Sequence, residues 1–78
     1  MTIDPRIHQI ALEQLTENQF RAWSLSIAGM SQRSIAYALD ISRTTANDRL
    51  DAAWRTLRKH GIMVTPDGRP YLTTEVEA

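Results

Sequence analysis

The stretch that decides the fold is GMSQRSIAYALDISRTTANDRLDAAWRTLR, residues 29–58. Apolar residues recur in it at helical spacing, which predicts helices over residues 31–39 and 43–60. Asp40 falls where the chain must turn sharply, and aspartate tolerates left-handed backbone better than most residues. Ile41 is expected to fill the angle between the helices, and Ser42 to cap the second. Two helices joined by so short a turn form a helix-turn-helix, whose second helix can enter the major groove of DNA.

Two further helices are predicted ahead of this unit. Asp4 and Pro5 are typical of an N-cap and a first helical position, which favours a helix over residues 5–15. Thr16 opens a capping box for another helix over residues 17–28. The sequence therefore predicts four consecutive helices.

The fourth helix has an apolar face that should be buried. The spacing of its apolar residues predicts that they form a single stripe along the helix: Ala46, Leu50, Ala53, Trp54 and Leu57. After Gly61 the pattern changes to β-prone residues around the turn Thr65-Pro66-Asp67-Gly68. We therefore predict an all-α fold, with a four-helix domain over residues 1–62 and a short extended or hairpin tail over residues 63–78.

Composition restricts the classes of function. The chain has 78 residues, no cysteine and zero net charge. Without cysteine it has no disulfide, thiolate zinc site or cysteine nucleophile, and an intracellular, cytoplasmic location is expected. His8 and His60 lie apart from any acidic cluster, so no metal or cofactor is expected. No serine has a base at a readable spacing, so we expect no enzyme activity. No segment reaches the ~20 apolar residues of a membrane span.

The zero net charge is unevenly distributed along the chain. Residues 31–60 contain six basic residues against three acidic ones, whereas the segments on either side are net negative. A basic middle third is typical of a local nucleic-acid surface. Arg49 is expected either to pair with Asp40 or Asp48, or to contact DNA.

The motif of residues 29–46 resembles a known signature. It is similar to G-[LM]-S-x-x-x-I-A-x-x-L-x-[IV]-S-x-x-T-V, which LuxR-type helix-turn-helix domains share with the fourth conserved region of sigma factors. The run over residues 45–58 resembles the T-V-x-x-R-L-x-x-A-x-x-x-L-R pattern of extracytoplasmic-function sigma factors. The resemblance covers residues 15–60 and implies DNA binding by the helix that begins at Ser42.

The resemblance assigns the candidate DNA-binding residues. Ser31 and Arg33, at the preceding helix, would lie near phosphates. The residues of the second helix expected to face bases or phosphates are Ser42, Arg43, Thr44, Asn47 and Asp48. Arginine can fork onto guanine and asparagine onto adenine. We expect Arg43 and Asn47, four residues apart, to share the face opposite the apolar stripe.

Three departures from the pattern are informative. The sigma region that binds the −10 element is missing. Prolines after Gly61 forbid the short dimerisation helix of LuxR-type domains. Ala46 replaces the usual valine or isoleucine, so packing there is expected to be looser or to be compensated by Trp54.

The sequence favours a sequence-specific regulator of transcription, for example a repressor, of phage or mobile-element type, that binds double-stranded DNA as a homodimer. Its dimer surface is expected on the first helix or after Gly61. Two alternatives stay open: a protein-interaction module for RNA polymerase or a sigma or anti-sigma partner, and a DNA-packaging or recombination accessory factor.

Overall fold

Four helices followed by a small β-hairpin make up the part of the chain that the computed structural model describes, residues 4–73. The elements are α1 (Pro5–Gln14), α2 (Glu17–Ile27), α3 (Gln32–Leu39), α4 (Arg43–Lys59), β1 (Ile62–Val64) and β2 (Pro70–Leu72). Each helix ends within one residue of its predicted bounds. The predicted all-α fold with a C-terminal hairpin is confirmed.

The start of each helix could be predicted from the sequence because a side chain caps it. The Asp4 carboxylate accepts from the Arg6 amide, and Thr16 forms the predicted capping box. Ser31 and Ser42 cap α3 and α4 by accepting from backbone amides three residues ahead. Caps of this kind stabilise a helix by about 1 kcal/mol each.

The turn between α3 and α4 is a Schellman motif. Asp40 is left-handed, with φ 58° and ψ 48°. The Ile41 amide donates to the Ala36 carbonyl at 3.0 Å, and the Asp40 amide donates to the Tyr37 carbonyl at 3.2 Å. Ile41 then packs beside Ala36 in the core, as this motif requires. The predicted roles of Asp40 and Ile41 are confirmed.

The left-handed geometry of Asp40 gives a test by substitution. Asp40→Gly is expected to leave the free energy of unfolding unchanged or to raise it by up to about 1 kcal/mol, because glycine adopts positive φ without strain. Asp40→Val should instead lower it by about 1–2 kcal/mol. Urea denaturation followed by circular dichroism measures both. A loss above about 1 kcal/mol in Asp40→Gly would reveal a specific partner for the carboxylate.

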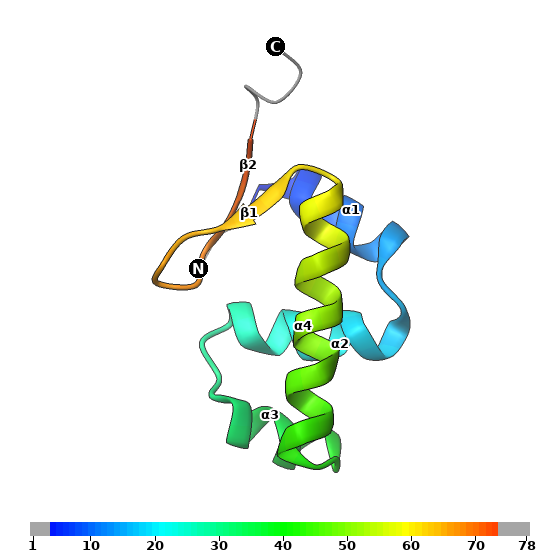
Figure 1. The fold of residues 1–78 in the computed structure, drawn as a ribbon, viewed down its shortest axis with the longest axis vertical. Helices are drawn as coiled ribbons and strands as arrows, with labels where there is room; N and C mark the ends of the chain where they lie inside the picture. Colours follow the sequence, from blue (N-terminus) through cyan, green and yellow to red (C-terminus); the bar gives the residue numbers. More distant parts are fainter. Residues whose placement is uncertain (1–3, 74–78) are drawn as a thin grey trace.

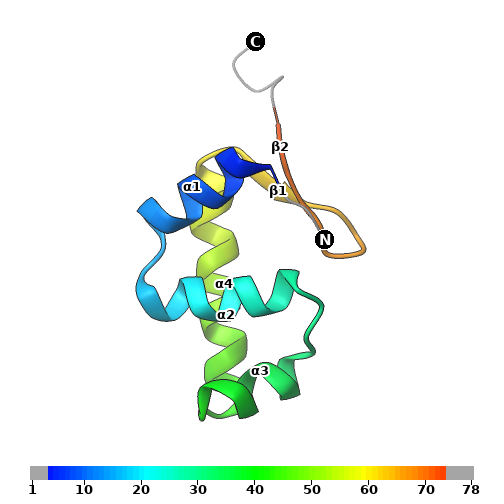
Figure 2. The same cartoon turned by 180° about the vertical axis from the view of Figure 1, so that it is seen from behind.

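The core consists of two clusters joined by α2 and α4. The backbone shows the same division, since α1 and α3 lie toward opposite ends of α4 (Figures 1 and 2). In the α1-side cluster, α1 packs on the second half of α4; its buried residues are Ile7, Ala11, Leu15, Trp23, Ala53, Leu57 and Ile62. In the α3-side cluster, α3 packs on the first half of α4; its buried residues are Ala22, Ile35, Ala36, Ala46 and Leu50. The apolar stripe predicted on α4 is thus divided between the two clusters.

This division corrects the expectation for Ala46. Ala46 is fully buried in the α3-side cluster, beside Ala22 and Ala36. Trp54 packs against the other cluster and therefore does not compensate for the small side chain. Ala46 instead shares its cluster with an alanine from each of two neighbouring helices, Ala22 of α2 and Ala36 of α3.

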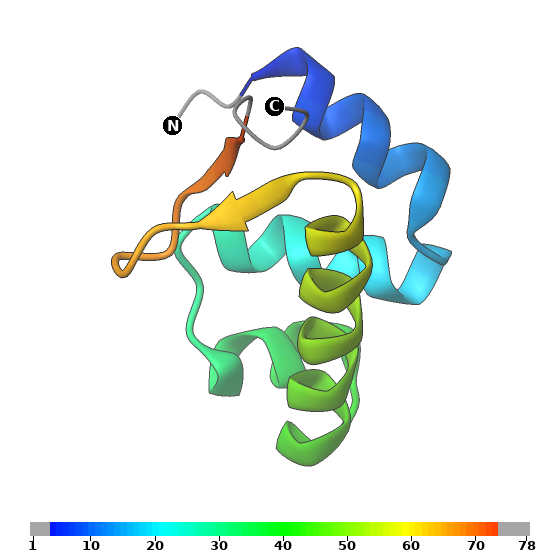
Figure 3. The same cartoon turned by 45° about the horizontal axis from the view of Figure 1, so that its top comes forward.

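The hairpin closes the α1-side cluster (Figure 3). Its strands are antiparallel, with Ile62 opposite Leu72. Ile62 is fully buried, and Leu72 packs on the same cluster. Pro70 is tolerated because both strands of a two-stranded sheet are edges. The hairpin is therefore packed on the helical core along its apolar side.

Candidate nucleic-acid interface

A polar hollow lies where the start of α3 meets the start of α4. Its volume is about 310 Å³, and it is lined by Gln32, Arg43, Thr44 and Asn47. All four side chains are exposed. Three of them are residues that the sequence singled out, so the fold brings Arg43, Thr44 and Asn47 to one place.

Gln32 is the residue of the hollow that sequence reasoning missed. Its Nε2 donates a hydrogen bond to Oδ1 of Asn47 at 2.8 Å, joining the first residue of α3 to the second turn of α4. The two residues are fifteen apart in sequence, so no local pattern could reveal the contact. A polar residue at the first position of α3, on the side facing α4, was the available signal.

The contact also corrects the expected orientation of Asn47. The sequence predicts that Arg43 and Asn47 face away from the apolar stripe of α4. Asn47 instead lies at the border of the stripe, against α3. The reason is helical geometry: Arg43 and buried Leu50 are seven residues apart and so fall on nearly the same side. Arg43 is exposed there because it lies in the first turn of α4.

The remaining candidate residues have different surroundings. The Ser31 hydroxyl accepts a hydrogen bond from the Ser34 amide at 3.2 Å, and the Ser42 hydroxyl accepts one from the Thr45 amide at 3.0 Å. Both serines therefore act first as helix caps. Asp48 is exposed and does not line the hollow. The structure therefore separates a central group around Asn47 from two caps that position it.

The cations of α3 and α4 are free of ion pairs within the described residues. The ion pairs found in residues 4–73 join Arg6 to Asp4, Arg21 to Glu17 and Arg69 to Asp67, all outside these two helices. The basic residues without one are Arg33, Arg43, Arg49, Arg55, Arg58 and Lys59. Arg49 thus pairs with neither Asp40 nor Asp48, which settles that part of the open alternative.

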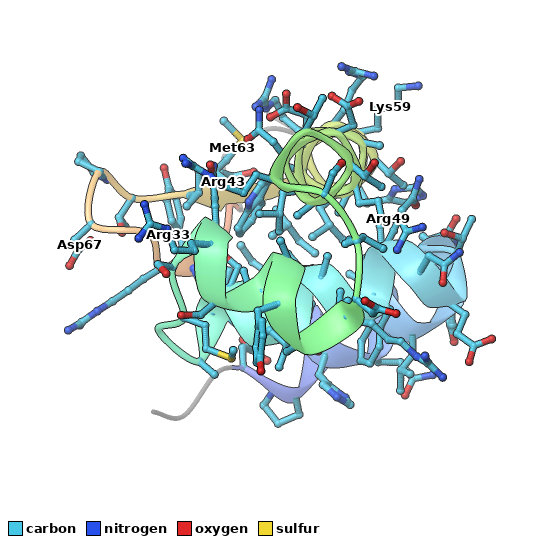
Figure 4. The ribbon with its side chains drawn as sticks, turned by 90° about the horizontal axis from the view of Figure 1, so that it is seen from below. Arg33, Arg43, Arg49, Lys59, Met63 and Asp67 are labelled. Carbon is cyan, nitrogen blue, oxygen red and sulfur yellow. The ribbon has the colours of Figure 1, made fainter. Side chains whose placement is uncertain are left out.

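Arg33 and Arg43 lie on the same side of α4 (Figure 4). Arg49 and Lys59 lie on the other side of the helix. Arg43 lines the hollow, and both guanidinium groups are exposed and have no carboxylate partner among residues 4–73. Such groups suit phosphate oxygens and guanine edges.

By contrast, the charged groups that do pair stabilise local structure elsewhere. Hydrogen bonds from Arg6 lower the pKa of the Asp4 carboxyl at the start of α1. A hydrogen bond from the Thr65 hydroxyl lowers the pKa of Asp67 in the hairpin turn. These acids hold a helix cap and a turn, and neither residue lines the hollow.

The tryptophans belong to the core, as predicted. Trp23 is fully buried and meets half-buried Trp54 edge to face, with ring centroids 6.2 Å apart. Neither is placed to stack on a nucleic-acid base. Within residues 4–73 we find no group of three histidine or acidic side chains able to hold a metal ion. No helix in that range is long and apolar enough to cross a membrane.

Comparison with known protein families, curated proteins and solved structures finds no match to this chain.

Proposed function

We propose that the protein binds double-stranded DNA in a sequence-specific manner and regulates transcription in the cytoplasm, with the start of α4 in the major groove. The observation that carries this proposal is the polar hollow of Gln32, Arg43, Thr44 and Asn47 at the joint of a helix-turn-helix. It offers side-chain donors and acceptors that can read base edges. The resemblance of residues 15–60 to LuxR-type and sigma region 4 domains supports the same placement.

The charge distribution supports phosphate binding around this hollow. The exposed guanidinium group of Arg43 lines the hollow, that of Arg33 lies on the same side of α4 (Figure 4), and neither has a carboxylate partner within residues 4–73. A surface cation in an ion pair would have to give up its carboxylate partner to bind a phosphate, whereas these two cations have no ion pair to give up. Backbone amides at the starts of α3 and α4 add favourable dipoles for the same anions.

We further propose that two copies act together. One helix-turn-helix reads only a few base pairs, so a second copy on a repeated or palindromic site would raise the affinity. Large apolar side chains are exposed at the far end of the molecule: Leu12 on α1, Val64 on β1 and Tyr71 on β2. These elements include the two surfaces that the sequence suggested for dimerisation.

The dependence of binding on salt tests the electrostatic part of the proposal. We expect about 3–5 phosphate contacts per protomer: six cations of α3 and α4 have no ion pair within the described residues, but Arg49 and Lys59 lie on the other side of α4 from Arg33 and Arg43 (Figure 4). Each contact adds about −0.9 to the slope of log K against log salt, so the slope should be about −3 to −5 per half-site. Fluorescence anisotropy between 50 and 200 mM salt measures it. A slope near zero for a complex that still forms contradicts phosphate binding.

The decisive experiment is selection of bound fragments from a random DNA pool, followed by sequencing. A shared motif in the bound pool supports sequence-specific binding. Retention of DNA without a motif would favour an accessory role in packaging or recombination. No retention, combined with co-purification of RNA polymerase or a sigma factor, would support the interaction module instead.

A further inference from the structure

The two faces of the hairpin differ in what they contact. Ile62 and Leu72 lie opposite each other and pack on the α1-side cluster, so one face is covered by the helices. Met63 and Tyr71 form the neighbouring pair of the register. Because side chains alternate along a strand, these two lie on the outer face, where Tyr71 is exposed. Arg69 comes two residues before Tyr71, so the outer face continues to its side chain.

The outer face lies on the same side of α4 as the proposed DNA-binding residues. Figure 4 looks along α4, and in this view Met63 and Asp67 lie on the same side of the helix as Arg43. Arg49 and Lys59 lie on the other side. Figures 1 and 2 also show the hairpin turn on the side of α4 where the loop between α2 and α3 lies. The hairpin begins at the far end of α4, but its turn therefore projects toward the DNA side.

DNA bound at the hollow would bring phosphates to this side of the molecule. The major groove is about 12 Å wide, so a helix that lies in it has a phosphate backbone along each flank. An element that projects on the DNA side of α4, beyond its first turns, faces one of these backbones. The outer face of the hairpin offers two donors for phosphate oxygens, the Arg69 guanidinium and the Tyr71 hydroxyl.

The ion pair between Arg69 and Asp67 does not prevent such a contact. Its closest approach, from Arg69 Nε to Asp67 Oδ2, is 3.5 Å, which is longer than a normal hydrogen bond. Both side chains are about two-thirds exposed, and exposed pairs of this kind contribute little to stability. The turn has its own support, because the Arg69 amide donates to the Thr65 hydroxyl, which in turn donates to Asp67. Exchange of Asp67 for a phosphate therefore leaves the hairpin intact.

We infer that the hairpin is a second DNA-contacting element, in which Arg69 and Tyr71 donate to backbone phosphates beside the base pairs read by α4. This inference rests on the proposed DNA-binding function and extends the interface from the helix-turn-helix to residues 62–72. Phosphate contacts carry no sequence information, so the hairpin adds affinity for all DNA and leaves the motif unchanged. It also assigns Tyr71 to DNA, which leaves α1, with its exposed Leu12, as the surface for a second copy.

The test measures the affinity and the salt dependence of three hairpin variants on the selected motif and on scrambled DNA. Arg69→Ala should weaken binding to both by about threefold to tenfold. It should also reduce the slope of log K against log salt by about 1 per protomer, since one phosphate contact is lost. Tyr71→Phe removes a neutral donor, so it should weaken both by about twofold to fivefold and leave the slope unchanged.

Asp67→Asn should have the opposite effect. Asparagine keeps an acceptor for the Thr65 hydroxyl, so the turn survives, but the negative charge is removed from the side that faces phosphates. Binding to both DNAs should become stronger by about twofold to fivefold. A residue with a purely structural role would not produce this gain.

The ion pair of Arg21 with Glu17 supplies matched controls. It is similarly exposed, and it lies in the first half of α2, which begins on the opposite side of α4 from the hairpin turn (Figure 1). Arg21→Ala and Glu17→Gln make the same changes of charge and should leave the affinity and the slope unchanged. Circular dichroism confirms the folding of each variant, and sedimentation gives its oligomeric state.

The outcomes distinguish this inference from the proposed function. A parent protein that selects a motif, with an unchanged affinity and slope in Arg69→Ala, overturns the role of the hairpin and leaves DNA reading by α4 intact. A loss of affinity that accompanies dissociation of a dimer overturns it as well, because the outer face would then bind a second copy. A parent that binds no DNA overturns both proposals together.

Discussion

Replacing Trp23 by alanine is expected to cost about 3–5 kcal/mol of the free energy of unfolding, the usual range for deleting a buried aromatic side chain. The free energy of unfolding of a chain of this length is about 4–12 kcal/mol in total, so the variant should lose about a quarter of its stability or more. Trp23 is fully buried in the α1-side cluster and contacts the rings of Phe20 and Trp54. Urea denaturation followed by the helical circular dichroism signal measures the loss.

Two other variants identify the cause of the effect. Trp54→Ala removes the same side chain from a half-buried position and should cost clearly less. Trp23→Phe should also cost less than Trp23→Ala, because it keeps an aromatic ring and removes a buried Nε1–H that has no hydrogen-bond partner among residues 4–73. Equal losses for Trp23→Ala and Trp54→Ala would contradict the assignment of Trp23 to the centre of the cluster.

Replacing Arg43 by alanine is expected to weaken binding to the selected DNA motif by about 10-fold to 100-fold, the range of a specific contact to a base. Arg43 is exposed in the first turn of α4, so the fold should survive its removal. Binding to the motif and to scrambled DNA is measured by anisotropy at one salt concentration, with circular dichroism as the check on folding.

Arg58→Ala is the matched control for Arg43→Ala. Both changes remove one exposed guanidinium group from α4 that has no ion pair within the described residues. The two residues are fifteen apart, so they are separated by about 20 Å along the helix. Arg58→Ala should therefore weaken all sequences alike or have no effect. Equal losses of motif preference in the two variants would show that the start of α4 is not the part that reads DNA.

The helices could be predicted because their ends depend on local chemistry. Ser31 and Ser42 accept amides three residues ahead, and Asp40 takes up a left-handed conformation within its own turn. These interactions span at most one helical turn, so the sequence around each of them is sufficient evidence. The apolar spacing of α4 likewise identified residues that are buried.

The arrangement of the core could not be predicted in the same way. The spacing of Ala46, Leu50, Ala53 and Leu57 shows which face of α4 is buried but not what covers it. The division into two clusters depends on where α1 and α3 cross α4, and those crossings involve residues far apart in sequence. The burial of Ile62 against α4 has the same origin.

The candidate site was predicted in part for the same reason. Arg43, Thr44 and Asn47 belong to one helix, so a helical pattern was enough to group them. Gln32 joins them only because α3 packs beside α4 at this point. The hydrogen bond between Gln32 and Asn47 depends on that packing and has no local signature in the sequence.

The hollow lies at the start of α4, whereas α1 and the hairpin lie at its other end (Figure 1). The 17 residues of α4 make these ends about 25 Å apart. Because the chain contains no cysteine, a single thiol introduced by Gln14→Cys at the end of α1 would be a unique point of covalent attachment. The protein could then be immobilised on a sensor surface with its hollow directed into solution, where duplex DNA can reach it without obstruction.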